Sequence, residues 1–236
     1  MNKIIEKTLE LLSNNNEWKE RYAKYIKYIK GKQRKGFNKP EGLSVYTSVS
    51  MFKKNLYDLR FDGQSVGTLE IKSKEFLLPK NKANLKYFGA YGYRTTKDKM
   101  KWICSEATEF RKFYKDLSKK RILIKLKSPE HRVENRLLME FAKRTRAENK
   151  ALTDIQPITL DGSFFQMPTP LKASSHEPTY AKQYGGGIDI LARIKLKGKS
   201  RICVMEVKDE NKDSESQALA MEQALSYATF IACLLK

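Results

Sequence analysis

Apolar positions recur every three or four residues in five segments of the chain, which is the period of an amphipathic helix. The pattern predicts helices over residues 3–13, 17–30, 105–120, 128–144 and 214–235. The apolar faces of the first two would consist of Ile4, Ile5, Leu9 and Leu12, and of Trp18, Tyr22, Tyr25, Ile26 and Ile29. Ser105 is a candidate cap for the third helix, and the last begins at Ser214 or Ser216.

The helix over residues 128–144 combines an apolar face with acidic residues. Ser128 is a favourable N-cap, and Pro129 fits the first helical position. The expected buried stripe consists of Val133, Leu137, Leu138 and Phe141. Glu130 and Glu134 are separated by one helical turn, so either acid can face a neighbouring element.

Shorter apolar runs bounded by glycine predict strands and hairpins. Residues 55–61 and 65–71 flank Asp62-Gly63, a hairpin signal whose loop could exceed two residues. Further strands are expected over 121–126, 161–171, 185–196 and 200–208. The last two are joined at Lys197-Gly198-Lys199, so they should pair antiparallel. In residues 128–236 the order helix, three strands, helix predicts an α/β layer arrangement.

The overall composition is that of a soluble protein in a reducing compartment. The chain has 236 residues, and no apolar run approaches the roughly 20 residues of a membrane helix. Its first residues do not read as a signal peptide, so a cytoplasmic location with no membrane partner is expected. The three cysteines are far apart, and only two histidines are present, which argues against a Cys/His zinc site.

The net charge of +20 is concentrated in the first half of the chain. Residues 1–127 hold 31 Lys and Arg against 13 Asp and Glu, whereas residues 128–236 hold 16 against 14. We therefore expect a basic α+β region over 1–127 that binds nucleic acid, beside a domain over 128–236 that uses carboxylates. Lysines that merely solvate a surface are the alternative. Interleaved aromatic and basic residues over 84–102 suit base stacking, although a small β core is the favoured interpretation.

Charged side chains interrupt the apolar strands of the second hairpin. Glu206 and Lys208 are two apart, so they point to one face, opposite to Val207. In a hairpin centred near residue 198, Asp189 pairs roughly with Val207 and, with a small register shift, stands beside both charged residues. Two close carboxylates repel each other unless a cation lies between them, and Mg²⁺ prefers oxygen ligands. The strand ends predict a metal platform, and a solvated ion pair is the simpler alternative.

Three stretches of residues 128–236 together resemble the PD-(D/E)XK nuclease superfamily: GGGIDILARI (185–194), CVMEVKDE (203–210) and MEQALSYATF (221–230). Gln223 and Tyr227 are similar to the Q-x-x-x-Y signature of its RecB-like and λ-exonuclease-like branch. The resemblance implies an α/β restriction-endonuclease-like core, made of a helix, a mixed central sheet and a helix. It also implies phosphodiester hydrolysis that depends on a divalent metal.

The resemblance also implies a set of site residues. Glu134, Asp189, Glu206 and the carbonyl of Val207 would bind Mg²⁺ or Mn²⁺, with Glu130 as a substitute for Glu134. Lys208 would orient the attacking water or stabilise charge on the phosphorus oxygens. Gln223 and Tyr227 would position the substrate and the site.

The chain departs from the family pattern at two places. Ile188 stands where the family name has proline, and the chain ends nine residues after Tyr227, where the family usually adds a strand. Either that strand is replaced, or the chain is a fragment of a longer protein. Gly185, Gly186 and Gly187 could allow a close approach to DNA or simply form a flexible loop.

Three functional classes follow from these observations. The favoured hypothesis is a divalent-metal-dependent nuclease that acts on DNA rather than RNA, in repair, recombination or defence. The alternative is a catalytically inactive nuclease-like core whose basic region binds DNA or RNA. The third is a structural or protein-interaction domain with a solvated charge pair.

Overall fold

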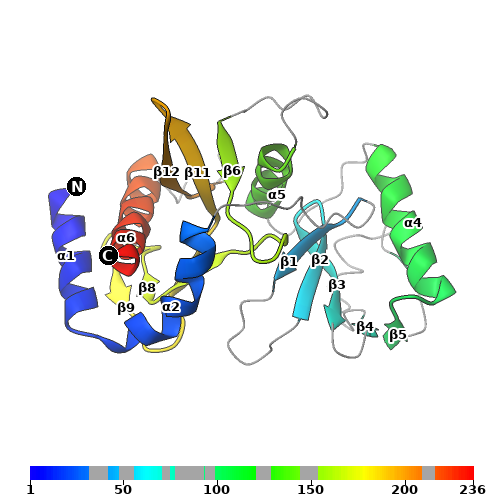
Figure 1. Ribbon diagram of the computed structural model, residues 1–236, viewed down its shortest axis with the longest axis horizontal. Coiled ribbons are helices and arrows are strands. Elements are labelled where there is room, and N and C mark those ends of the chain that lie inside the picture. The colour runs from blue at the N-terminus through cyan, green and yellow to red at the C-terminus, as the bar shows by residue number, and fades with distance from the viewer. Residues whose placement is uncertain are drawn as a thin grey trace. The chain divides into compact units, whose positions relative to one another are not determined.

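The computed structural model describes residues 1–31, 42–47, 56–70, 75–77, 93, 99–120, 129–143, 154–208 and 216–236, and of residues 75–77 only the backbone. In these residues the fold is mixed α/β, with five helices and several small antiparallel sheets (Figure 1). Every strand ladder among them is antiparallel, so the mixed central sheet of a nuclease-like core is not confirmed. The predicted strand 121–126, Ser128 and most of 84–102 lie outside the described residues.

The chain divides into two compact units, and each is built from separate stretches of sequence. Unit 1 comprises Met1–Arg34, Phe141–Thr159 and Gln166–Lys236, and unit 2 comprises Lys35–Glu140 and Leu160–Phe165. This division differs from the boundary that we expect between residues 127 and 128. The first two helices belong with the C-terminal half of the chain in unit 1.

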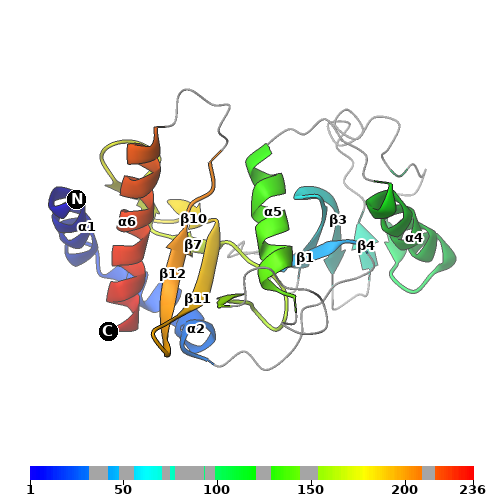
Figure 2. The same ribbon diagram turned by 90° about the horizontal axis from the view of Figure 1, so that it is seen from above.

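Unit 1 contains three described helices, two of which pack on each other through aromatic side chains. They are α1 (Asn2–Ser13), α2 (Glu17–Lys30) and α6 (Gln217–Leu235), which confirms the predicted helices. Trp18 and Tyr22 of α2 contact Phe230 of α6 edge to face, with ring centroids 5.6 and 5.2 Å apart. Figures 1 and 2 both show α6 between α1 and the strands β11 and β12.

The ends and faces of these helices refine the sequence interpretation. Ser216 is the N-cap of α6, and its hydroxyl accepts a hydrogen bond of 3.2 Å from the Leu219 N–H. On α1 the buried side chains are Thr8 and Leu12, whereas Leu9 is 41% exposed, so the expected apolar face was wrong at that position.

Helix α6 is the one described helix that is long and apolar enough to cross a membrane, judged by length and composition. That finding departs from the expectation that no such segment exists. A core helix passes the same test, and six α6 residues are buried within the protein: Gln223, Ser226, Tyr227, Phe230, Ile231 and Leu234. We therefore treat α6 as the central helix of unit 1.

The main sheet of unit 1 has the order β12-β11-β6, with β6 at Ile155–Pro157, β11 at Ile190–Leu196 and β12 at Lys199–Met205. A two-residue turn joins β11 to β12, and both Lys197 (φ 47°) and Gly198 (φ 78°) adopt positive φ. This is the backbone that a tight hairpin requires. The ladder runs from Leu196 opposite Lys199 to Ile190 opposite Met205, which confirms the predicted hairpin.

The predicted strand over 185–196 is broken at Asp189. Residues before the break form β10 (Gly186–Ile188), which pairs with β7 (Met167–Thr169) in a separate two-stranded sheet. A second small sheet pairs β8 (Leu171–Lys172) with β9 (Thr179–Tyr180). The expected strand over 161–171 is therefore two short strands, and the break leaves Asp189 outside both ladders.

Unit 2 is a five-stranded antiparallel sheet with two helices. The strands are β1 (Ser44–Thr47), β2 (Leu56–Phe61), β3 (Gln64–Glu70), β4 (Glu75–Leu77) and β5 (Lys99–Lys101), in that order across the sheet. β2 and β3 form the predicted hairpin through the two-residue turn Asp62-Gly63, in which both residues have positive φ. Helix α4 (Ser105–Lys119) packs Phe110 and Tyr114 into the same core as Leu59 and Phe61. Its N-cap is Cys104, not the predicted Ser105.

Helix α5 (Pro129–Phe141) confirms the predicted helix but buries a different face. Glu134, Asn135, Leu138 and Phe141 are buried, whereas Val133 is 43% exposed, so its place in the predicted stripe was wrong. The Asn135 amide donates hydrogen bonds to the Ser44 hydroxyl (2.8 Å) and the Tyr46 hydroxyl (3.2 Å). These polar contacts explain the rotation of the face, because a buried amide is stabilised only where partners are available.

Candidate active site

Asp189 and Glu206 stand opposite each other at the end of the β11–β12 ladder. Continuing the register one step beyond Ile190 and Met205 places Asp189 opposite Glu206. The Val207 N–H donates a hydrogen bond of 2.9 Å to Oδ2 of Asp189. Both the charge of Asp189 and its polar groups act on the pKa of Glu206, which places the two residues next to each other. The two predicted ligands are therefore brought together.

The surroundings of Glu206 disfavour the ionised form of its carboxyl group. Burial, and next the neighbouring Asp189 carboxylate, raise the pKa of Glu206 above its ordinary value, while the positive charge of Lys208 acts in the opposite direction. Its Oε1 atom is buried and has no hydrogen-bond partner among the described residues. A buried oxygen left in this state is costly, and a bound cation is one way to satisfy it.

Lys208 belongs to the same group of side chains. It follows Glu206 by two residues, is half-buried, and its ammonium is close enough to lower the pKa of Glu206. Between them, Val207 is buried and fixed by its hydrogen bond to Asp189. The sequence Glu-Val-Lys thus places a carboxylate and an ammonium beside Asp189, as expected.

Gln223 and Tyr227 of α6 complete the group. Both side chains are buried and lie one helical turn apart. The Gln223 amide is hydrogen-bonded to the Tyr227 phenol, while the Oε1 atom of Gln223 is buried and lacks a partner within the described residues. Burial first, and the nearby Glu206 second, raise the pKa of Tyr227 to about 12. The phenol therefore stays protonated and can donate a hydrogen bond at neutral pH.

Two glycines before Asp189 allow other parts of unit 1 to come close. A Cβ on Gly186 would stand 2.5 Å from the Tyr227 hydroxyl, and one on Gly185 would stand 2.5 Å from the Leu171 backbone. Neither distance is possible for a real side chain. The glycine run is therefore explained by close packing against Tyr227 and β8, which neither sequence interpretation of it foresaw.

Sequence reasoning missed Tyr184, whose phenol lies near enough to Asp189 to respond to its charge. Burial, and then the Asp189 charge, raise the pKa of the Tyr184 phenol. Its hydroxyl would lie 3.1 Å from a Cβ on Gly187, yet 58% of the residue remains exposed. Its position immediately before a glycine run was the one feature of the sequence that distinguished Tyr184. Residues in a loop show no periodicity, so the pattern of apolar residues could not identify it.

Glu134 and Glu130 belong to unit 2, on α5. Glu134 is buried, and its charge contributes to raising the pKa values of Arg60 and Tyr46, after larger causes in each case. Across the described residues, no three Asp, Glu, His or Cys side chains form a group that could hold a metal by themselves. Among the described residues of unit 1, the acidic side chains gathered at the site are those of Asp189 and Glu206, and Glu134 as a metal ligand stays a prediction.

The residues gathered in unit 1 fit a magnesium-type ion. Such ions are often bound by one or two carboxylates, with water and substrate phosphate as the remaining ligands. Asp189 and Glu206 supply two carboxylates, and the orphaned oxygens of Glu206 and Gln223 are acceptors that a cation or its water can satisfy. The donor set is all oxygen, which favours Mg²⁺ or Mn²⁺ over softer metals.

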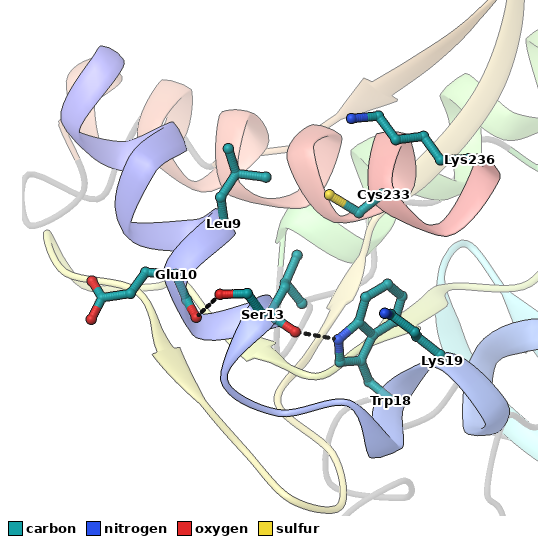
Figure 3. A pocket seen from close by; sticks show the side chains of 8 residues that line it. Leu9, Glu10, Ser13, Trp18, Lys19, Cys233 and Lys236 are labelled. Atoms are coloured by element: carbon teal, nitrogen blue, oxygen red, sulfur yellow. Dashed lines mark hydrogen bonds between the residues drawn. The ribbon is translucent and has the colours of Figure 1, made fainter.

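A separate pocket of about 470 Å³ lies where α1 and α2 meet the end of α6 (Figure 3). Its lining includes Leu9, Trp18 and Cys233, with charged groups from Glu10, Lys19 and Lys236. The Trp18 Nε1–H donates a hydrogen bond of 2.9 Å to the Leu12 carbonyl, which fixes the indole in the wall. None of the residues around Asp189 lines this pocket.

Comparisons of the chain with models of protein families, with curated proteins and with solved structures found no match. The functional interpretation therefore depends on the residues and their geometry.

Proposed function

We propose that this protein is a divalent-metal-dependent nuclease that hydrolyses phosphodiester bonds in DNA. One observation carries the proposal. Asp189, Glu206, Lys208, Gln223 and Tyr227 come from three separate stretches of sequence and gather around one pair of carboxyl groups in unit 1. These residue types match the set implied by the resemblance to PD-(D/E)XK nucleases.

In this proposal Asp189, Glu206 and the Val207 carbonyl hold a Mg²⁺ or Mn²⁺ ion. The ion supplies an activated water and neutralises charge on the phosphate. The hydrogen bond from the Val207 N–H keeps the Asp189 carboxylate in place. Deprotonation of Glu206 accompanies metal binding, because its raised pKa favours the protonated form in the free protein.

Lys208, Gln223 and Tyr227 act directly on the substrate or on the site. The Lys208 ammonium stabilises negative charge that develops on the phosphate oxygens. The Gln223 carbonyl oxygen orients a water molecule, since it is a buried acceptor without a partner among the described residues. Tyr227 remains a hydrogen-bond donor at neutral pH, and it positions Gln223 through their shared hydrogen bond.

The charge of the chain supports a polyanionic substrate. The net charge is +20, and contacts with phosphate are sensitive to salt because they release bound counterions. A basic protein attracts DNA and concentrates it near a site that carries negative charge of its own.

A cleavage panel tests the proposal. The purified protein is incubated with linear, circular, single-stranded and double-stranded DNA, and with RNA, in Mg²⁺, Mn²⁺ or EDTA. We expect DNA cleavage in Mg²⁺ or Mn²⁺ that stops in EDTA and in Asp189→Ala and Lys208→Ala. Cleavage that persists in either variant would assign the activity to another site or to a contaminant.

An inactive nuclease-like core that binds nucleic acid is the second candidate. One observation favours it: across the described residues, two carboxylates rather than three gather at the site. In the same panel, this alternative predicts salt-sensitive DNA binding without cleavage by the wild-type protein under any metal condition.

A further inference from the structure

The tip of the β11–β12 hairpin is basic and carries no acidic residue. Residues 190–205 contain five Lys or Arg and no Asp or Glu, although residues 128–236 as a whole are close to neutral. Four of these side chains are exposed near the turn: Lys195, Lys197, Lys199 and Arg201. Among the residues that the structure describes, none of these four side chains forms an ion pair.

An exposed apolar side chain stands among these charges. Leu196 is 53% exposed and lies opposite Lys199, at the last pair before the turn. Leu196 therefore presents apolar surface to solvent directly beside exposed lysines. In proteins that bind the grooves of DNA, leucine and similar side chains insert between bases while neighbouring lysines and arginines contact phosphates.

The base of the hairpin is held firmly against α2. The Arg193 guanidinium donates hydrogen bonds to the carbonyls of Tyr28 (2.8 Å), Ile29 (2.9 Å) and Gly31, which are at the C-terminal end of that helix. These carbonyls have no partner further along the helix, so the guanidinium satisfies them. The exposed Lys27 and Lys30 lie at the same helix end. The hairpin is therefore an arm that α2 supports through Arg193.

We infer that the β11–β12 hairpin is a substrate-binding arm, in which Lys195, Lys197, Lys199 and Arg201 contact DNA phosphates and Leu196 contacts bases. This inference rests on the proposed function and names the surface that holds the substrate. It also assigns a DNA contact to the C-terminal half of the chain, whereas charge alone pointed to residues 1–127.

The arm and the carboxylates lie at opposite ends of the same two strands. Figure 2 shows β10, which precedes Asp189, at one end of the β11–β12 pair and the turn at the other. A strand advances about 3.3 Å per residue, so the eight steps from Asp189 to Lys197 span about 26 Å. That distance corresponds to about eight base pairs of duplex DNA. DNA that reaches the carboxylates can therefore contact the tip several base pairs from the cleaved bond.

The test measures DNA binding without cleavage. Fluorescence anisotropy of a labelled 30-base-pair duplex is followed in EDTA at several salt concentrations. The triple variant Lys195→Ala/Lys197→Ala/Lys199→Ala should bind about tenfold more weakly. The slope of its log affinity against log salt concentration should become shallower by the amount expected for the loss of about two to three phosphate contacts. The matched control, Lys3→Ala/Lys7→Ala/Lys172→Ala, removes the same charge from exposed positions of unit 1 and should change both quantities much less.

A second variant separates the apolar contact from the charges. Leu196→Ser keeps every charge, so it should weaken binding about fivefold and leave the salt dependence unchanged. Equal affinities and salt slopes for the hairpin triple variant and its control overturn the inference. If the hairpin triple variant loses binding to anionic phospholipid vesicles but still binds DNA like the control, the inference is overturned and the hairpin is assigned to a membrane surface. Circular dichroism and thermal melting check that each variant is folded.

The outcomes distinguish this inference from the proposed function. If the wild type binds DNA through the hairpin but cleaves nothing in Mg²⁺ or Mn²⁺, the proposed nuclease activity is refuted and the DNA-binding role of the hairpin is supported. If the wild type cleaves DNA and the hairpin variants bind and cleave like the control, the DNA-binding role of the hairpin is refuted and the nuclease activity is supported. A wild type that does not bind DNA refutes both.

Discussion

The backbone N–H of Val207 donates a hydrogen bond of 2.9 Å to the Asp189 carboxylate, which joins the two strand ends beyond the last pair of the β11–β12 ladder. The contact holds Asp189 beside Glu206 and Lys208, although all three residues lie outside the ladder. The proposed metal site is built from this arrangement and from the two α6 side chains that face it.

Glu206 should make the stability of the metal-free protein depend on pH. Its pKa is raised in the folded state, so the folded protein holds a proton that the unfolded chain releases above about pH 4.5. The free energy of unfolding therefore falls as the pH rises from that value toward the raised pKa, with a slope of up to about 1.4 kcal/mol per pH unit. Urea denaturation in EDTA between pH 5 and pH 8 measures this slope.

Glu206→Gln is the matched variant for this effect. It removes the titrating group and the repulsion from Asp189, so the pH slope should flatten and stability at pH 8 should rise. The same variant should lose at least about tenfold in Mn²⁺ affinity, since it removes one of the two carboxylates. A variant that keeps the wild-type pH slope would show that Glu206 is not the group whose pKa is raised.

Gly186 and Tyr227 should be coupled energetically. A methyl group on Gly186 would overlap the Tyr227 hydroxyl, so Gly186→Ala should cost about 1–3 kcal/mol of stability and lower cleavage. In a Tyr227→Phe background the hydroxyl is gone, and the same substitution should cost about 1 kcal/mol less. A double-mutant cycle by chemical denaturation checks this. Strictly additive effects would mean that the two residues are not in contact.

Tyr184 should contribute to substrate binding through its exposed ring. Base stacking on an aromatic side chain is worth about 1–3 kcal/mol, so Tyr184→Ala should raise the KM for single-stranded DNA about tenfold with a smaller change in kcat. Tyr184→Phe retains the ring and should behave like the wild type. Steady-state kinetics compare the two, and equal losses in both variants would assign the role to the hydroxyl.

The sequence predicted the β11–β12 hairpin that carries the candidate site. The predicted pairing of its strands differs from the observed pairing by one residue. A turn that includes Lys199 places Asp189 opposite Val207, whereas the two-residue turn Lys197-Gly198 places it opposite Glu206. One step along a strand exchanges the two faces, so turn length decides which side chain meets Asp189. Ser216 as the cap of α6 was readable from sequence because capping is local.

Other features depend on contacts between distant parts of the chain. Residues 160–165 join unit 2 through hydrogen bonds between Phe164 and β1, and no local pattern marks that segment. The exposed Val133 reflects the polar partners that Asn135 finds on β1. Tyr184 lies in a loop, where periodicity gives no information about the side chains that it meets.

The position of a bound Mn²⁺ ion tests the central claim most directly. Crystals grown or soaked with Mn²⁺ give anomalous difference density that locates the ion independently of any assay. We expect one strong peak about 2.0–2.3 Å from carboxylate oxygens of both Asp189 and Glu206, and no peak there in Glu206→Ala. Saturating Mn²⁺ that leaves no density between these two carboxylates would contradict the proposed metal site.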